Sequence, residues 1–255
     1  MTRKLALVTG ASGGIGLAIA RLLARAGYDL ALVARTAAKL ESVATELRAA
    51  GDIVVTTFAA DLSAPGAARA VFDRIPACDV LVNNAGFASN GAFAELEEQR
   101  LFDEIALDVT ALTQLCRLYL PGMIERGNGR ILNVASTAAF LPGPGMAVYY
   151  ASKAYVLSFS EALAEELRGT GVTVTCLCPG ATATGFAERA RMLDTPLMRG
   201  PQGDAADVAR AGFAGMLAGR PVVVPGVTNK VLSWTAHLTP RRVLLWLSRK
   251  AVERN

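Results

Sequence analysis

Apolar runs of strand length alternate with segments of helical periodicity along almost the whole chain. The runs are residues 4–9, 29–34, 53–60, 79–86, 129–136, 172–179 and 221–225. They are apolar throughout instead of alternating, which is typical of strands buried on both faces of a parallel sheet. The pattern therefore predicts an α/β fold, a doubly wound parallel sheet of about seven strands with helices on both faces.

Helical patterns fill the intervals between these runs. They cover about residues 14–26, a stretch that ends near residue 47, residues 107–126, and a helix that starts at Tyr149 and ends near residue 167. No internal repeat, low-complexity tract or linker divides the chain. One domain that spans residues 1–255 is therefore expected.

The composition supports a large core and a mildly basic surface. Hydrophobic residues make up 52% of the 255 positions, and the net charge is +4, from 26 basic and 22 acidic residues. This charge suits an anionic cofactor, but a nucleic-acid-binding face would cluster Lys and Arg. No nucleic-acid partner is therefore expected.

Cysteine usage and the first residues bear on metal binding and compartment. Cys78, Cys116, Cys176 and Cys178 form no CxxC pair, and the chain has 1 histidine, so no metal site is expected and the thiols are interpreted as buried and free. An apolar strand begins at Lys4, which leaves no room for a signal peptide. No apolar run approaches the ~20 residues of a membrane span. These features predict a cytoplasmic protein.

A glycine-rich turn follows the first predicted strand. The turn reads TGASGGIG, and Gly10, Gly14 and Gly16 lie between strand and helix. Glycines allow close approach of a pyrophosphate, and a helix N-terminus supplies free N–H groups and positive potential. At this position the turn predicts a dinucleotide site.

The end of the second predicted strand indicates which dinucleotide binds. NAD-selective folds usually place a carboxylate there, on the adenosine ribose. Here the sequence reads VART, without a carboxylate, and Arg35 offers a guanidinium suited to a 2′-phosphate. We therefore expect NADP(H) in preference to NAD(H). The alternative is that Arg35 is an ordinary solvated arginine.

Tyr149 and Lys153 are four residues apart, so on a helix they share one face. A phenol titrates near ~10, a poor match for proton transfer at neutral pH. A lysine cation one turn away favours the phenolate and is expected to lower that pKa. Tyr150 is three residues from Lys153, a less favoured pairing, and is interpreted as a packing residue.

Together the motifs resemble the short-chain dehydrogenase/reductase family. TGASGGIG, NNAG at 83–86, Ser136, the Tyr149–Lys153 pair and PGATAT at 179–184 occur in that family's order and spacing. The resemblance covers about residues 4–225 and is to the branch with one short Rossmann domain. It implies that Tyr149 is the general acid or base, that Ser136 binds the substrate oxygen, and that Lys153 supports the phenolate and holds the nicotinamide ribose.

The resemblance also implies a cofactor site at the ends of the strands. In it Asp61 would hold the adenine amino group, residues 83–86 would stabilise the fourth strand and border the adenosine ribose, and residues 179–184 would meet the nicotinamide. The expected cofactor-binding residues are Gly10, Ser12, Gly13, Gly14, Ile15, Gly16, Arg35, Asp61, Leu62, Asn83, Ala85, Gly86, Tyr149, Lys153, Pro179, Gly180, Thr182 and Thr184.

One position departs from the family pattern. Most members have an asparagine in the long helix, where its main-chain carbonyl holds a relay water, but here the text LDVTALT places Asp108 there. We count Asp108 with the reactive set Ser136, Tyr149 and Lys153. A carboxylate would offset part of the field of Lys153 and leave Tyr149 less acidified. The alternative is that Asp108 only rearranges a local hydrogen bond.

The residues around the reactive set are mostly apolar. They are Phe87, residues 139–148, and Phe186, Met192 and Leu193 within residues 185–202, where the family has a mobile substrate lid. Such a lining favours an apolar ketone, aldehyde or acyl chain over a sugar. The same residues would be expected if they only packed the core.

The C-terminal residues 226–255 form an extension beyond the resemblance. From Pro240 onward, Val243, Leu244, Leu247 and Val252 oppose a set of basic residues, as in an amphipathic helix. Three interpretations stay open: the extension docks on its own domain or on a sister subunit, residues 230–255 lie on an acidic membrane surface, or another partner binds there.

The sequence thus predicts an NADP(H)-dependent reductase of an apolar ketone or aldehyde, or a dehydrogenase of the matching alcohol. A homodimer or homotetramer is expected. The alternatives are a non-catalytic NADPH-binding regulator, in which Asp108 has impaired the relay, and a membrane-surface reductase of lipid acyl or sterol ketones.

Overall fold

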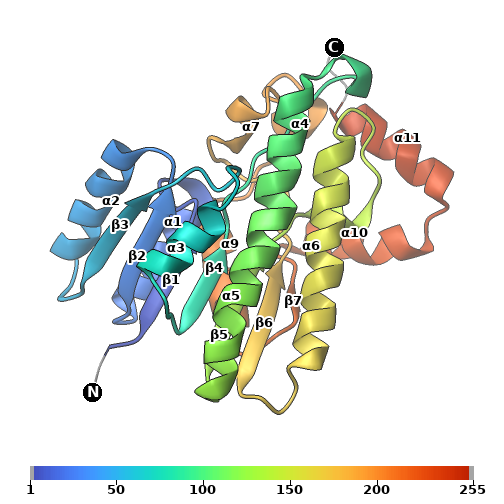
Figure 1. Ribbon diagram of the computed structural model, residues 1–255. Coiled ribbons are helices and arrows are strands. Elements are labelled where there is room, and N and C mark those ends of the chain that lie inside the picture. The colour runs from blue at the N-terminus through green and yellow to red at the C-terminus, as the bar shows by residue number, and fades with distance from the viewer. Residues whose placement is uncertain (1–2, 253–255) are drawn as a thin grey trace.

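The computed structural model describes residues 3–252 (Figure 1). One seven-stranded sheet runs through it in the order β3-β2-β1-β4-β5-β6-β7, and every adjacent pair is parallel. The strands are β1 (Leu5–Thr9), β2 (Asp29–Ala34), β3 (Val55–Ala59), β4 (Val80–Asn83), β5 (Gly129–Val134), β6 (Val172–Leu177) and β7 (Val222–Val223). The predicted doubly wound sheet is confirmed.

Helices cover both faces of the sheet (Figure 1). One face packs on α1 (Gly14–Arg25), α2 (Ala37–Ala49) and α9 (Ala205–Leu217), and the other on α3 (Ala67–Arg74), α5 (Leu112–Glu125) and α6 (Ala147–Glu166). Each face has its own core of fully buried side chains, such as Leu23 and Leu132 on the first and Leu7 and Ile131 on the second. This double burial explains the continuously apolar strands.

The edge strand β3 departs from that pattern. Val55 is buried, but Thr57 and Phe58 are only partly buried, and Thr56 and Ala59 are exposed. The prediction of burial on both faces is wrong here, because β3 has a neighbour on one side only.

The long helix before β5 begins earlier than the sequence predicted. It starts as α4 (Glu98–Ile105), passes through a π-helical segment, η2 (Ala106–Ala111), and continues as α5. Asp108 lies within the π-helical segment. Such segments widen one turn and occur often at functional sites.

Two helices follow β7, where only one was expected. They are α10 (Val227–Leu238) and α11 (Arg241–Val252), and they stand beside α6 at the edge of the molecule (Figure 1). The remaining short elements are η1 (Phe93–Glu95), η3 (Thr137–Phe140), α7 (Phe186–Arg189) and α8 (Pro196–Arg199). The segment predicted as a lid, 185–202, contains α7 and α8.

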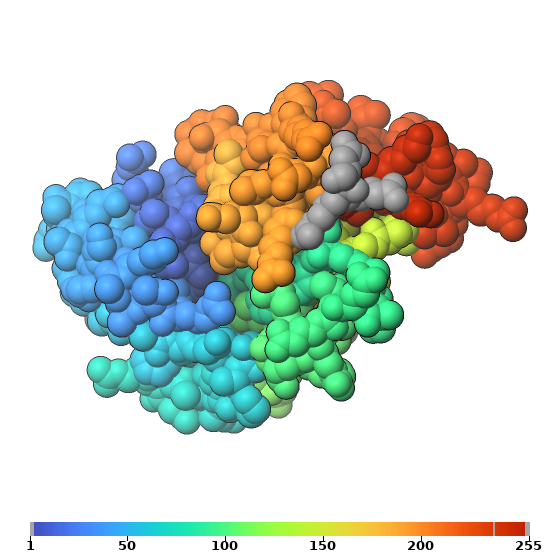
Figure 2. Space-filling model, turned by 90° about the horizontal axis from the view of Figure 1, so that it is seen from above, coloured from blue at the N-terminus to red at the C-terminus, as the bar shows by residue number. Residues whose placement is uncertain are grey.

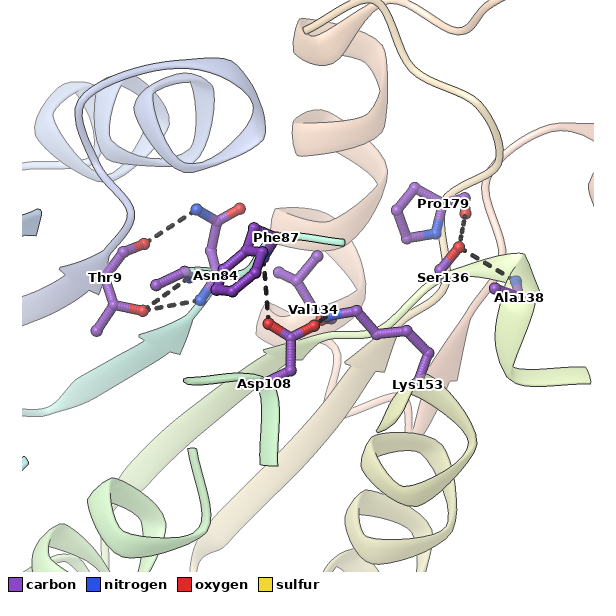
Figure 3. Close-up of polar contacts among 10 residues, drawn as sticks. Thr9, Asn84, Phe87, Asp108, Val134, Ser136, Ala138, Lys153 and Pro179 are labelled. Carbon is purple, nitrogen blue, oxygen red and sulfur yellow. Dashed lines mark hydrogen bonds and ion pairs between the residues drawn. The ribbon is translucent and has the colours of Figure 1, made fainter. Parts of the chain in front are cut away.

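The strand order reverses between β1 and β4, so the loops after these strands diverge and leave a crevice. Asn84, after β4, ties the two loops together. Its side-chain amide donates to the carbonyl oxygens of Thr9 and Gly10, and its backbone N–H donates to the Thr9 hydroxyl at 3.0 Å (Figure 3). The crevice therefore has a fixed floor.

Candidate functional site

A cavity of about 780 Å³ opens at this crevice and runs from the end of β2 to the C-terminal helices. Seen from above, the orange segment that includes the predicted lid lies between the blue N-terminal part and the red C-terminal helices (Figure 2). The cavity brings together most of the predicted site residues: Gly10, Ser12, Gly13, Gly14, Ile15, Arg35, Asp61, Leu62, Ala85, Gly86, Ser136, Tyr149, Lys153, Pro179, Gly180, Thr182 and Thr184.

Three predicted residues lie behind the cavity wall instead of lining it: Gly16, Asn83 and Asp108. The Asn83 amide is buried and donates to Asn133 Oδ1 at 2.9 Å, which joins β4 to β5. The neighbouring Asn84 lines the cavity in its place. The NNAG text does not reveal which of its two asparagines faces which way.

The glycine turn has the close contacts that require glycine. A Cβ on Gly16 would lie 2.6 Å from the Gly10 carbonyl oxygen, and Gly10 itself has φ +65° with Ala85 Cα 2.9 Å from where a Cβ would be. Gly13, the residue before α1, is different, because a Cβ there would meet only open space. No side chain of the described chain caps the N-terminus of α1, and its first turn has no acidic residue. The cavity thus has a cradle with positive potential, which fits a phosphate group.

Basic residues surround the end of β2. Arg35 and Lys39 both line the cavity there, whereas the stretch Ala34–Thr36 contains no carboxylate. Arg189, on α7, reaches the same region from above. Partial burial and the nearby charge of Arg35 lower the pKa of Arg189. An anion between Arg35 and Arg189 would relieve their repulsion. Lys39 and Arg189 were not predicted, because neither belongs to a motif.

Ser136 follows β5 and is held by the backbone around it. Its side-chain oxygen accepts from Ala138 N–H at 3.1 Å, which caps η3, and its hydroxyl donates to the Pro179 carbonyl at 3.5 Å (Figure 3). These two contacts fix the hydroxyl beside Tyr149.

Tyr149 projects from the first turn of α6 into the cavity, and its ring packs against Phe186 with centroids 5.4 Å apart. Although the ring lines the cavity, enough protein surrounds it that burial raises the pKa of the phenol. The charge of Lys153 and a hydrogen bond from Ser136 lower that pKa, and Asp108 and Glu104 raise it. Lys153 thus lowers the pKa of the phenol, as the sequence predicted, but burial, which the sequence argument left out, raises that pKa by more.

Lys153 lies one turn further along α6 and is buried. Its Nζ is 2.9 Å from Asp108 Oδ2 and 3.4 Å from the Val134 carbonyl (Figure 3). The same nitrogen is 5.5 Å from the centre of the Tyr149 ring. Burial pulls the pKa of Lys153 down, but the charges of Asp108 and Tyr149 outweigh burial and raise it. The ammonium form is therefore favoured.

Asp108 makes the contacts that both interpretations of the sequence require. One carboxylate oxygen pairs with Lys153, and the other accepts from the Phe87 backbone N–H at 3.2 Å. Burial raises the pKa of Asp108, against the opposing effects of Lys153 and the Phe87 N–H. Gly86 is required at this point, because a Cβ there would lie 2.9 Å from Asp108 Oδ1.

A second buried acid, Glu104, lies one helical turn before Asp108 and was not predicted. It is fully buried, and neither carboxylate oxygen has a hydrogen-bond partner of normal geometry among the described residues. Burial raises its pKa to about 7, assisted by the charge of Asp108 and opposed by Ser89 and Arg100. Glu104 can thus exchange a proton near neutral pH. In sequence it resembles any glutamate of an exposed amphipathic helix, so no signal marked it.

The far end of the cavity is apolar. Its lining there includes Leu141, Met146, Tyr150, Phe186, Met192, Leu197, Met198, Leu232, Leu244, Leu247 and Ala251. Leu193, which was expected here, is 58% exposed and points elsewhere. Leu232 of α10 and Leu247 of α11 were not assigned to the site, because the sequence places them beyond the recognised motifs.

Other expected features concern the whole described chain. The four cysteines are buried and free. Within residues 3–252 no group of three or more potential metal-ligating side chains occurs. Over the same residues no helix is both long and apolar enough to cross a membrane.

Comparison with known proteins gives consistent matches. Residues 4–193 match the family model described as short chain dehydrogenase. Ketoacyl reductase HetN of Nostoc sp. (strain PCC 7120 / SAG 25.82 / UTEX 2576) is 36% identical over 196 residues, which cover 75% of this chain and 68% of that protein.

Two solved structures extend the similarity over nearly the whole chain. A short-chain dehydrogenase from Sphingobium yanoikuyae in complex with NADPH is 33% identical, with a TM-score of 0.83 and coverage of 94% of both chains. The bulky-bulky ketone specific alcohol dehydrogenase from Comamonas testosteroni is 29% identical, with a TM-score of 0.79 and coverage of 93% of this chain and 94% of that one.

Proposed function

The chain belongs to the short-chain dehydrogenase family, and from this membership we propose that it is an NADP(H)-dependent reductase of apolar ketones or aldehydes. The observation that carries the proposal is the convergence of Ser136, Tyr149 and Lys153 on one cavity that also contains the glycine turn. Proton transfer and phosphate binding are thereby available in the same space.

The proton chemistry belongs to the chain's own side chains. A bound nicotinamide cofactor would supply or accept the hydride. Tyr149 donates a proton to the carbonyl oxygen during reduction and accepts it during alcohol oxidation. Ser136 donates a hydrogen bond to the same oxygen and fixes its direction. Lys153 stabilises the phenolate that forms when Tyr149 gives up its proton. This offsets part of the free-energy cost of burying that charge.

The choice of NADP(H) rests on charge at the end of β2. Arg35 and Lys39 are positioned for a 2′-phosphate, and Arg189 can approach the same anion from α7. A guanidinium binds a phosphate through paired, charge-assisted hydrogen bonds. The NADPH complex of the Sphingobium yanoikuyae relative supports this choice.

The apolar end of the cavity supports the substrate class. An aryl or alkyl group would bury the apolar surface of Phe186, Met192 and Leu244. A sugar would place polar hydroxyl groups against the same surface and would gain little from its burial. The names of two relatives, a ketoacyl reductase and a bulky-bulky ketone specific alcohol dehydrogenase, fall in this class.

A self-associated state is also proposed. Phe102, Ile105 and Tyr155 expose 56%, 39% and 39% of their surface on neighbouring helices α4 and α6. Large exposed apolar side chains on neighbouring helices are typical of an interface between copies. Light scattering across protein concentrations would measure the mass, and a monomer at every concentration would refute the assignment.

The proposed reaction is tested by NADPH oxidation against a panel of apolar ketones, aldehydes and sugars. We expect turnover of an apolar carbonyl compound, loss of at least about a thousandfold in kcat for Tyr149→Phe, and little change for Tyr150→Phe. NADPH binding without turnover of any carbonyl compound or matching alcohol would instead support a non-catalytic regulator. A fully active Tyr149→Phe protein would refute the assigned mechanism.

A further inference from the structure

Helix α10 turns an apolar stripe toward solvent. Val227, Val231, Trp234 and Leu238 are spaced at helical intervals, and their exposed fractions are 78%, 55%, 69% and 71%. The helix packs on the domain through its other side, where Ala236 is buried. A helix normally buries its apolar stripe, so this stripe lacks its cover among the described residues.

Helix α11 continues the exposed surface. Its buried residues Leu244, Ser248 and Val252 share one face, which holds it to the domain. The opposite side exposes Val243 by 45%, Trp246 by 55% and Leu247 by 48%. The Trp246 ring lies 4.2 Å from Lys250 Nζ. The chain's 2 tryptophans, Trp234 and Trp246, therefore both lie on this surface.

Positive charge is concentrated on the same two helices. Residues 226–252 contain Lys230, Arg241, Arg242, Arg249 and Lys250, all exposed, and no acidic residue. Without these five, the chain has 21 basic residues against 22 acidic ones, from totals of 26 and 22. The net positive charge of the protein thus belongs to this segment, and the rest is close to neutral.

The surface is continuous with the mouth of the cavity. Leu232 and Leu247 are 39% and 48% exposed, and both also line the cavity. Figures 1 and 2 show the two helices at the edge of the molecule, beyond α6. A flat partner that covers the stripe would therefore meet the cavity's opening.

We propose that α10 and α11 bind an anionic lipid surface, so that the mouth of the substrate cavity faces the lipid. Tryptophan and aliphatic side chains enter the headgroup boundary, and lysine and arginine pair with the lipid phosphates. A neutral apolar surface would not need the five cations. A second copy of this face would repel the first, because both would be equally positive. The inference that a lipid-dissolved carbonyl substrate enters the cavity rests on the proposed function. The inference that the helices bind lipid does not.

The test uses the full-length protein and its own tryptophans. It is mixed with vesicles of phosphatidylcholine alone, or of phosphatidylcholine and phosphatidylglycerol in equal parts, and binding is followed by sedimentation and tryptophan emission. We expect a blue shift and at least about tenfold tighter binding to the anionic vesicles. High salt should weaken that binding, because the cations are exposed.

A matched pair of variants identifies the surface. Val231→Glu places a charge in the α10 stripe, and Val54→Glu places one at a site of similar exposure, 59% against 55%, elsewhere on the protein. We expect about a tenfold or greater loss of vesicle binding for Val231→Glu only. The paired change Arg241→Gln and Arg242→Gln should weaken binding to anionic vesicles and leave binding to neutral ones unchanged. Circular dichroism checks that each variant is folded.

Three results would overturn the proposal: no emission shift with either vesicle, equal binding by both valine variants, or tryptophans already shielded in lipid-free buffer in an assembly that Val231→Glu dissociates. The last result would show that a second copy covers the stripe.

Activity separates this proposal from the proposed function, because Val231 does not line the cavity. Vesicle binding without carbonyl reduction refutes only the reductase, and reduction without vesicle binding refutes only the lipid surface. Val231→Glu should lose turnover of a ketone dissolved in anionic vesicles while retaining turnover of a water-soluble one.

Discussion

The ammonium nitrogen of Lys153 lies 2.9 Å from a carboxylate oxygen of Asp108, and both side chains are buried. The pair ties the π-helical segment to α6 directly beneath Tyr149. Asp108 thereby acts on the phenol in two opposite ways. Its negative charge raises the pKa of Tyr149 directly, and by keeping Lys153 protonated it preserves the charge that lowers the same pKa.

Substitution of Asp108 by asparagine separates these two effects. We expect the direct charge effect to be the larger one, so that Asp108→Asn lowers the pKa of Tyr149, since an anion no longer opposes the phenolate. Reduction requires the protonated phenol, so the high-pH limb of its kcat/KM profile should move down by about one pH unit. The low-pH limb of alcohol oxidation should move the same way.

The control for this change is Asp73→Asn, at an exposed position on α3. It should leave both profiles in place. An upward shift in Asp108→Asn would mean that the carboxylate acts chiefly by holding Lys153 protonated. Superimposable profiles would mean that Asp108 has only a structural role.

Glu104 predicts a pH dependence of stability. Burial raises its folded pKa to about 7, whereas an unfolded glutamate titrates near ~4.3. Because the pKa is higher in the folded state, protonation of Glu104 stabilises the fold. This contribution to the free energy of unfolding is fully present below pH ~4.3, is lost as pH rises, and is gone above about pH 7. The loss at pH 8 amounts to roughly 3 to 4 kcal/mol.

Glu104→Gln removes this ionisation while it keeps the shape of the side chain. Relative to the unchanged protein, the variant's melting temperature should be roughly 6 °C higher at pH 8 and nearly equal at the acid end. Thermal unfolding between pH 5 and 8 measures the difference. Glu125→Gln, at an exposed glutamate near the end of α5, is the matched control. Parallel melting curves for Glu104→Gln and the unchanged protein would contradict the buried titration.

The sequence predicted the parts of the site that belong to the scaffold. The glycine turn after β1 and the Tyr149–Lys153 spacing each follow from a local geometric requirement, a close backbone approach in one case and a shared helix face in the other. Both therefore leave a mark in a few adjacent letters. The continuous apolar runs marked the strands for the same reason, except at the edge strand β3.

The unpredicted parts depend on contacts between distant segments. Glu104 is buried because α4 packs beside α6, and Arg189 faces Arg35 because α7 folds over the cleft. The stripe of α10 has ordinary helical spacing, which in sequence indicates a buried face. Only the folded chain shows that these side chains stay exposed. Leu193 shows the opposite error, because the sequence predicted it to line the cavity. It is exposed and does not line the cavity, whereas its neighbour Met192 is buried and does.

The proposed preference for NADP(H) depends most directly on Arg35. Arg35→Ala removes a guanidinium at the end of β2, and the loss of a charge-assisted phosphate contact should raise KM for NADPH by about 10- to 100-fold. KM for NADH should change by less than about threefold. Initial rates with both cofactors measure the effect, and Arg74→Ala, an exposed arginine on α3, serves as control. An equal rise for both cofactors, or a preference for NADH in the unchanged protein, would contradict the assignment.

Phe186, in the segment predicted as a lid, lies directly against the Tyr149 ring, with ring centroids 5.4 Å apart. The Tyr149 ring therefore has Phe186 as one wall, and any substrate beside Tyr149 shares that space. Phe186→Ala removes about 100 Å² or more of apolar contact area, which should lower kcat/KM for small apolar ketones by about tenfold. Bulky diaryl ketones should lose less, because their second ring can occupy the vacated volume. Leu193→Ala, an exposed position in the same segment, is the matched control and should leave the ratio of the two kcat/KM values unchanged. A uniform loss for small and bulky ketones would show that Phe186 supports the lid without shaping the substrate pocket.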